Sequence, residues 1–284
     1  MPSIQVGDES AYLGWRGDVE EGILADTHLA DFVFPDGDKK GQRAVVKVYP
    51  ESSLGIINEI IGYALARSLA IPQPEHAAVF MLQTDRLPKK PTWMKDDEAE
   101  WIAFCTSWIP KKTCKPWFNN MRGAQENPPD KKTRKAWAKI SAELNQWLHA
   151  TRTCAFDHWV GNSDRNIGNL IRMGKGSFSV IDHGQLLGGE PWLQGGVNIN
   201  SVWDNKLKRL VAQKWNAKTK GALDSHLYQS SLDFTDGTTT FEVIDRLISF
   251  LDEDLGENGK QQLKDFLHHR AKVDYLKAHY RILA

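Results

Sequence analysis

One stretch, residues 161–184, limits what this chain can fold into more than any other. It begins with Gly-Asn-Ser-Asp-Arg-Asn-Ile-Gly-Asn and ends with Val-Ile-Asp-His-Gly. Between these strings, two apolar runs are separated by Gly174 and Gly176, which predicts a β-hairpin. Such a hairpin returns Asn169 and Asp182 to the same end, side by side.

Three oxygen-bearing side chains in this stretch differ in what they can do chemically. The carboxylate of Asp164 can accept a proton, whereas Asn169 and Asp182 offer the oxygen ligands that Mg²⁺ prefers. Phosphoryl transfer depends mainly on positioning and on neutralising charge, and these groups could supply both. Asp and Asn next to Gly are also ordinary turn residues, so either string alone is weak evidence.

The N-terminal half places a lysine where a strand is expected. Lys47 lies in the β-branched run 44–49, and a charge inside an apolar strand is unfavourable unless a partner meets it. Glu59 follows in segment 54–66, whose apolar residues recur at helical spacing and predict a helix. From the first turns of that helix, Glu59 could reach back to Lys47. Taken singly, Glu59 is better interpreted as a surface glutamate and Lys47 as an edge-strand lysine. The two together, after a strand and within a helix, favour a functional pair.

The strings D-R-x-x-x-N at 164–169 and I-D-x-G at 181–184 resemble the catalytic and metal-binding loops of atypical kinases. The nearest likeness is to the compact HipA-like serine/threonine kinases, and the phosphatidylinositol 3/4-kinases, which share the Asp-Arg dipeptide, come second. In protein kinases proper the Arg precedes the Asp, whereas here Ser163 precedes Asp164 and Arg165 follows it. This order favours the atypical group.

The resemblance implies a fold and a division of the chain. The expected fold is α+β and two-lobed, like that of protein kinases. Residues 1–108 would form a small mixed N-lobe with an antiparallel sheet, and residues 109–284 a mainly helical C-lobe, the two making one catalytic unit. Segment 103–110 is the expected hinge, where backbone groups would read the adenine.

The resemblance also implies ATP and Mg²⁺ as cofactors and assigns a role to each site residue. Lys47, held by Glu59, would contact the nucleotide phosphates. Asn169 and Asp182 would hold the metal. Asp164 would accept or orient the proton of the attacking hydroxyl. Arg165 would hold that loop in place or meet phosphate charge.

The loop that would cover the phosphates departs from the usual pattern. Gly14, Gly17 and Gly22 are spaced G-x-x-G-x-x-x-x-G. Glycines let backbone amides approach a phosphate, but they mark ordinary turns just as often. HipA-like kinases can be switched off by autophosphorylation of a serine in this loop. Residues 11–51 contain no serine, and Thr27 is their only hydroxyl of that type. Either Thr27 takes that role or this control is missing.

Further elements follow from periodicity. Segments 75–82 and 101–109 are expected strands, and segments 204–215, 241–255 and 259–282 are expected helices. One more helix is expected to run into the catalytic loop. Its core positions would be Trp137, Ile140, Leu144, Trp147, Leu148 and Thr151.

Composition limits the kinds of binding partner and the cellular location that can be expected. The formal net charge is +0, from 36 basic and 36 acidic side chains, which disfavours direct binding of nucleic acid. The three cysteines lack metal-ligand spacing, and Cys105 and Cys154 are expected core thiols in a reducing cytoplasm. No signal-like segment or membrane-length apolar run is present, so a cytoplasmic location without a membrane partner is expected.

The phosphate acceptor is open at this stage. The HipA resemblance implies a protein serine or threonine, and in that family the kinase often acts as a toxin beside a small antitoxin protein. A lipid or small-molecule kinase is one alternative, although the neutral charge argues mildly against a membrane face. A catalytically inactive kinase-like module is another, and AMP transfer on the same scaffold would use the same metal ligands.

Overall fold

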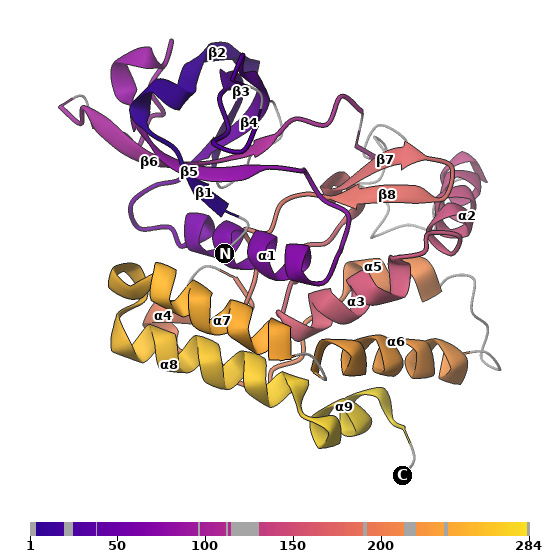
Figure 1. Ribbon diagram of the computed structural model, residues 1–284. Coiled ribbons are helices and arrows are strands. Elements are labelled where there is room, and N and C mark those ends of the chain that lie inside the picture. The colour runs from indigo at the N-terminus through magenta and orange to yellow at the C-terminus, as the bar shows by residue number, and fades with distance from the viewer. Residues whose placement is uncertain are drawn as a thin grey trace.

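The computed structural model describes residues 4–19, 25–37, 39–95, 97–111, 113–114, 131–189, 192–212, 220–235 and 238–282. The chain first builds a sheet and then a group of helices (Figure 1). Six strands form the N-terminal sheet in the order β1-β5-β6-β4-β3-β2. All neighbours are antiparallel except β1 and β5. In chain order the strands are β1 (Ile4–Val6), β2 (Tyr12–Asp18), β3 (Asp26–Phe32), β4 (Gln42–Val48), β5 (Ala77–Gln83) and β6 (Glu100–Ser107).

The two faces of this sheet pack against different partners. One face of the sheet carries its own core. This core contains Ala44, Val46 and Val48 of β4, all fully buried, together with the aromatic residues Phe32 of β3 and Phe80 of β5. Because successive side chains of a strand point to opposite faces, Lys47 points away from that core. It therefore faces the side of the sheet on which the helices lie.

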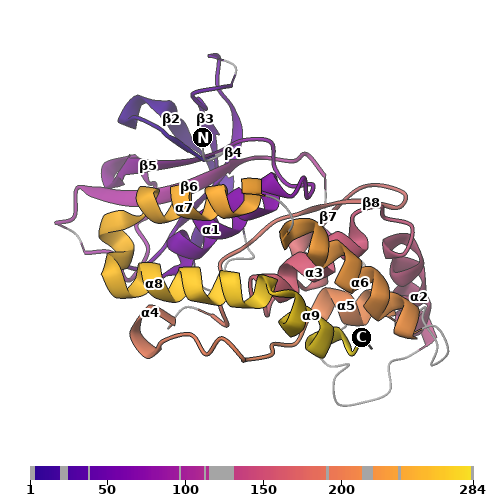
Figure 2. The ribbon, with the colours of Figure 1, turned by 60° about the horizontal axis from the view of Figure 1, so that its bottom comes forward.

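Helix α1 (Gly55–Ser68) joins the sheet to the helical half. Its apolar residues, among them Ile57, Ile60 and Ile61, share one core with Phe104 of the sheet and with the C-terminal helices. Helix α7 (Thr238–Phe250) packs against α1, and the two lie side by side in Figures 1 and 2. The amphipathic pattern that predicted α1 thus reflects burial against both halves of the molecule.

The C-terminal half is mainly helical, with one two-stranded sheet. The hairpin consists of β7 (Leu170–Gly174) and β8 (Ser177–Val180), as predicted. The remaining helices are α2 (Lys131–Leu144), α3 (Ala150–Trp159), α4 (Trp192–Gly195), α5 (Lys206–Ala212), α6 (Lys220–Thr235), α8 (Asp252–Ala271) and α9 (Val273–Tyr280). Short 3-10 turns lie at Glu9–Ala11, Thr84–Arg86 and Ile167–Asn169. This arrangement is the expected α+β, two-lobed, kinase-like fold.

Two expectations about helices were wrong, and one helix was missed. The continuous helix expected to run into the catalytic loop is two helices, because α2 ends at Leu144 and the chain turns before α3, which ends at Trp159. The turn buries Trp147 and leaves Leu148 86% exposed, so Leu148 is not a core residue. Helix α6 was not anticipated, and the expected helix over 259–282 is interrupted at Lys272, which has extended backbone angles.

The expected lobe boundary lies where the chain leaves the sheet. Strand β6 ends at Ser107, and residues 108–110 of the expected hinge segment lead out of it. A single bridge then pairs Thr113 with Ile171 of the hairpin. The division at residue 108 stays a prediction, since α1 contributes to the core of the second half.

Candidate active site

The predicted contact between Lys47 and Glu59 is present, and a third residue joins it. The ammonium group of Lys47 donates to Oε1 of Glu59 and, at 2.9 Å, to Oδ1 of Asp182. Strand β4, helix α1 and the loop after β8 each supply one member. Residues far apart in sequence therefore meet at a single charge cluster between the two halves.

The Lys47 cluster is buried on one side and open on the other. The side chain of Glu59 is 3% exposed, that of Lys47 is 17% exposed, and that of Asp182 is 42% exposed. Glu59 also accepts bonds from the hydroxyl of Tyr49 at 3.2 Å and the backbone amide of His183 at 3.0 Å. Two carboxylates thus hold the lysine, and two donors in turn hold one of those carboxylates, Glu59.

The pKa shifts in this cluster follow from burial and from the shared lysine. Burial alone would lower the pKa of Lys47, but Asp182 and Glu59 raise it well above its usual value. Burial would raise the pKa of Asp182, yet Lys47 brings it well below the usual range. Glu59 has a raised pKa, because burial and the second carboxylate outweigh the attraction of Lys47. The lysine is therefore charged and its most exposed partner, Asp182, is ionised.

Asp182 also has unusual backbone geometry. Its φ angle is 64°, in the left-handed region that residues with a Cβ rarely adopt. Such a conformation costs on the order of 1–3 kcal/mol and persists only where surrounding contacts impose it. Those contacts come from Asn58, whose amide donates to the carbonyl of Gly184 at 2.8 Å, and from Arg165, which donates to the carbonyl of Asp182 at 3.0 Å.

Arg165 holds the two loops together from inside the molecule. It is fully buried and donates to Oδ1 of Asp157 at 3.3 Å and to the carbonyls of Ile181 and Asp182. Its remaining nitrogen lies 3.0 Å from Nδ1 of His183. Since burial and the neighbouring Arg165 keep the pKa of His183 well below its usual value, that nitrogen accepts the bond. Of the two roles considered for Arg165, this geometry favours holding the loop.

Asp164 lies on the neighbouring loop with its carboxylate partly exposed. Its backbone amide donates to Oδ1 of Asn162 at 2.9 Å, and its Oδ1 accepts a bond from Asn166 at 3.2 Å. The amide of Asn169 donates to the Asp164 carbonyl at 2.8 Å. Lys206, at the start of helix α5, lies 2.5 Å from Oδ1 of the carboxylate. The contacts with Asn162, Asn166 and Asn169, all from its own loop, hold Asp164 in one orientation.

The predicted metal ligands have the oxygen atoms that Mg²⁺ requires. Asn169 directly precedes β7 and Asp182 follows β8, and the backbone amide of Ile181 bonds the Asn169 carbonyl at 3.1 Å. Within the described part of the chain, Oδ1 of Asn169 accepts no hydrogen bond, whereas Oδ1 of Asp182 accepts one from Lys47 at 2.9 Å. The donor set is one carboxylate and one amide oxygen, which suits a hard cation that keeps several waters.

The glycine-rich segment is only partly described. Gly14 and Gly17 lie in edge strand β2 with φ angles of 151° and 150°, next to irregularities in the pairing with β3. Gly22 lies outside the described residues, in the connection between β2 and β3. Thr27 lies on β3, directly opposite Lys47 in the strand register.

Sequence reasoning missed several residues of this site. Tyr49, Asn58 and Asn162 hold the motif residues, and Trp192 in turn donates to Oδ1 of Asn58 at 3.0 Å. Lys206 was missed as well, although it contacts Asp164. Tyr49, Asn58 and Asn162 lie within segments that the sequence analysis singled out, but their residue types gave no signal of a role. Trp192 and Lys206 come from segments without a motif.

Two further findings concern parts of the chain outside the site. In the part of the chain that is described, none of the helices has the length and apolarity needed to cross a bilayer. Cys105, Cys114 and Cys154 are free and buried, as expected for two of them.

Comparison with known proteins supports the fold. No family model matches the chain, and no curated protein sequence does. Among solved structures, the proinflammatory kinase CtkA of Helicobacter pylori is similar with a TM-score of 0.50 and 12% sequence identity. The match covers 98% of this chain and 100% of that one. The likeness therefore extends over both lobes, and the chain has a kinase-like fold.

Proposed function

We propose that this chain is an ATP- and Mg²⁺-dependent protein kinase that phosphorylates serine or threonine. The observation that carries the proposal is the contact of Lys47 with both Glu59 and Asp182. In kinases a lysine–glutamate pair and a metal-binding aspartate must be in place together for transfer to occur. The fold supports this reading, because a kinase of known structure matches along the whole chain.

Each side chain then has a defined task. Lys47 contacts the α/β phosphates, and Glu59 keeps it pointed at them. Asn169 and Asp182 hold Mg²⁺, which when bound neutralises negative charge on the phosphate oxygens. Arg165 and Asn58 keep the Asp182 loop in its left-handed conformation.

Asp164 handles the proton of the acceptor. The acceptor hydroxyl oxygen forms a bond to the γ-phosphorus, and the bond from that phosphorus to the bridging oxygen of ADP breaks. The hydroxyl proton passes to the Asp164 carboxylate, whose Oδ2 is the less encumbered oxygen because Oδ1 contacts both Asn166 and Lys206.

The test is transfer of label from γ-labelled ATP with Mg²⁺ to the protein and to a cell lysate, read by mass spectrometry. Phosphoserine or phosphothreonine is expected with wild type and not with Asp164→Asn or Asp182→Asn. Asp245→Asn, an exposed carboxylate paired with Lys264, is the matched control and retains activity. Label in the Asp182→Asn variant at the wild-type rate would overturn the metal assignment.

The other outcomes separate the alternatives. A mass gain of one nucleotide would replace the proposal with AMP transfer. Nucleotide binding without any transfer would make the chain a kinase-like binding module. Label recovered in lipid or in small molecules instead of protein would replace the acceptor class.

The toxin role that the HipA resemblance implies is tested separately. We expect growth arrest on expression in a bacterial host, relief by Asp164→Asn, and relief by a small antitoxin protein encoded beside this chain. Normal growth with an active enzyme would remove the toxin role and leave the kinase proposal intact.

A further inference from the structure

Among the described cations of the candidate site (Lys47, Arg165 and Lys206), the most exposed one belongs to neither sequence motif. Lys206, at the start of α5, places its ammonium group 2.5 Å from Oδ1 of Asp164. The side chains of both residues are 37% exposed. The pair therefore lies at the surface of the site, where a substrate can reach it.

Helix α5 holds Lys206 in a fixed position. The residue before it, Asn205, donates to the carbonyl of Cys154 at 2.7 Å and accepts from the amide of Lys208 at 2.8 Å. Leu207 is fully buried, and Ser141 of α2 donates to the carbonyl of Leu210 at 2.8 Å. These contacts make the approach of Lys206 to Asp164 a property of the fold and not of one flexible side chain.

Orientation of Asp164 does not depend on Lys206. Asn162 and Asn166 bond its backbone and carboxylate, and Asn169 bonds its carbonyl. Three asparagine side chains already orient Asp164, so Lys206 is not needed for that role. Its positive charge is therefore available to contact a substrate.

The neighbouring cations are engaged elsewhere. Lys47 contacts two carboxylates, and the fully buried Arg165 directs its donors to Asp157, His183 and backbone carbonyls. Phosphoryl transfer places negative charge on the three oxygens of the moving group, close to the catalytic carboxylate, and positive groups at that point stabilise it. Lys206 is a cation beside Asp164 that remains open to solvent.

We propose that Lys206 is a catalytic residue that contacts the γ-phosphoryl group of ATP during its transfer past Asp164. The inference rests on the proposed function and names the group that would stabilise the moving phosphoryl. The ammonium group contacts Asp164 in the structure, and when ATP binds it would share its three donors between the carboxylate and the γ-phosphate oxygens.

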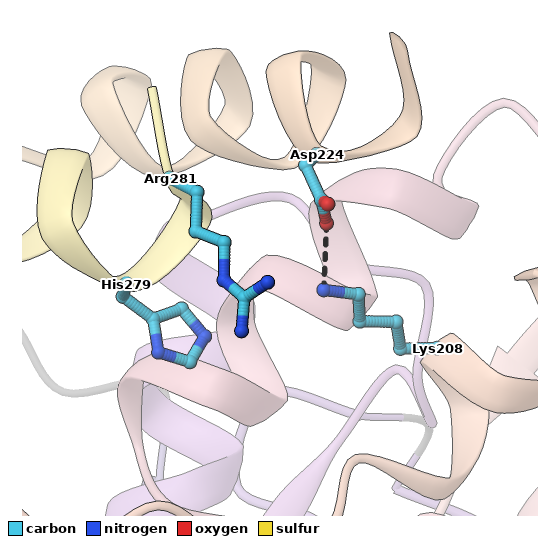
Figure 3. Close-up of a pocket in the computed structure, with 4 residues that line it drawn as sticks. All are labelled: Lys208, Asp224, His279 and Arg281. Atoms are coloured by element: carbon cyan, nitrogen blue, oxygen red, sulfur yellow. Dashed lines mark hydrogen bonds and ion pairs between the residues drawn. The ribbon is translucent and has the colours of Figure 1, made fainter. Parts of the chain in front are cut away.

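A matched control lies two residues further along the same helix. Lys208 is ion-paired with Asp224 at 2.8 Å and lines a hollow of about 190 Å³ together with His279 and Arg281 (Figure 3). Residues two apart on a helix point to nearly opposite sides, so Lys208 faces away from Asp164. Lys208→Gln changes the same charge on the same helix without touching the site.

The first measurement compares affinity for ADP and for the non-hydrolysable analogue AMP-PNP by titration calorimetry with Mg²⁺. Lys206→Gln is expected to leave ADP affinity unchanged and to weaken AMP-PNP binding about tenfold, because a hydrogen bond to a charged group is lost only with the γ-phosphate. Lys208→Gln is expected to bind both like wild type. An unchanged ratio of the two affinities in Lys206→Gln overturns the γ-phosphate contact.

The second measurement is phosphotransfer. Lys206→Gln is expected to lower kcat about 100-fold, with partial recovery in Lys206→Arg. Lys206→Cys treated with 2-bromoethylamine, which rebuilds a lysine-like side chain, is expected to recover activity. The native cysteines are buried, and burial raises their pKa values, that of Cys114 to about 12, so they are protected from this reagent.

The outcomes distinguish this inference from the proposed function. Full activity in Lys206→Gln overturns the role of Lys206 while the kinase proposal stands. Absence of transfer in wild type overturns the kinase proposal. The ratio of AMP-PNP affinity to ADP affinity in Lys206→Gln then still decides whether Lys206 contacts the γ-phosphate. Failure of both Lys206→Arg and the alkylated cysteine variant to recover any activity overturns the catalytic role.

Discussion

Two lysine–carboxylate clusters lie at the candidate site, and they differ in burial. In the Lys47 cluster, Glu59 is almost fully buried and Lys47 meets two carboxylates. In the Lys206–Asp164 pair, both side chains are more than a third exposed. A buried charge must keep its partners, whereas an exposed one can exchange a partner for a substrate. The contrast is between the buried Lys47–Glu59 pair, which suits holding a geometry, and the exposed Lys206–Asp164 pair, which suits exchanging a partner; Asp182 of the first cluster is itself 42% exposed.

The largest expected effect is loss of the buried lysine. Lys47→Met leaves Glu59 and Asp182 facing each other without a cation, and removing one partner of a buried pair typically costs about 3–5 kcal/mol. We expect a loss of that order in the free energy of unfolding, measured in urea. The double variant Lys47→Met, Glu59→Leu should recover part of it. If the double variant lost as much as both single changes together, the two side chains would not be acting as a pair.

The contact between α1 and the Asp182 loop should be nearly as sensitive. A Cβ placed on Gly62 would lie 2.4 Å from Cβ of His183, so Gly62→Ala forces the loop to move. Overpacking of this kind costs about 1–3 kcal/mol, and we expect lower phosphotransfer besides, because Asp182 is the adjacent residue. Gly221→Ala on α6 is the control, since its Cβ would meet nothing within 4 Å. Equal behaviour of the two variants in urea unfolding and activity assays would mean that the loop is not fixed by α1.

Acid should weaken the sheet that carries Lys47. Burial lowers the pKa of His28 on β3 to about 4. As pH falls below the usual value of about 6.5, the unfolded chain binds a proton at this position and the folded chain does not, so stability falls with pH. Between pH 7 and pH 5 this single group accounts for about 2 kcal/mol.

The measurement is the urea midpoint at both pH values. We expect a smaller difference between them in His28→Gln than in wild type, whereas the exposed His226→Gln serves as control and should keep the wild-type difference. An identical pH response in all three proteins would show that His28 does not resist protonation in the folded state.

The smallest effect on stability is expected at the exposed pair. Lys206→Gln removes an ion pair that water already screens, and such pairs contribute about 0–1 kcal/mol. The unfolding free energy should therefore change by less than about 1 kcal/mol while transfer activity falls sharply. A large loss of stability would instead show that Lys206, like Lys47, is a charge that the folded structure depends on. The two clusters would then not differ in the way described above.

The parts of the site that could be predicted from the sequence lie on elements that follow one another along the chain. Lys47 and Glu59 lie on a strand and on the helix that directly follows it, so periodicity and spacing sufficed to pair them. Asn169 and Asp182 flank one hairpin, and the turn glycines between its strands predicted their approach. In each case the chain between the two residues is short and regular, which leaves few ways to arrange it.

The parts that could not be predicted depend on packing at long range. Lys206 reaches Asp164 only because α5 is bonded to α2 and α3, and no motif near residue 206 marks it. The break after Leu144 was missed because the apolar residues keep helical spacing across it. In the structure the turn after Leu144 buries Trp147 and exposes Leu148, which the spacing alone does not indicate.

The sequence by itself determined the local chemistry: a proton acceptor, two oxygen ligands for a cation, and a lysine inside a strand that required a carboxylate. Tertiary structure alone decided that Lys47 has two partners, that Arg165 is fully buried under the Asp182 loop, and that Lys206 meets Asp164. The reason is physical. Residue type and spacing fix what a side chain can do and where its own element points, but charges from distant segments meet only when a shared core brings those segments together.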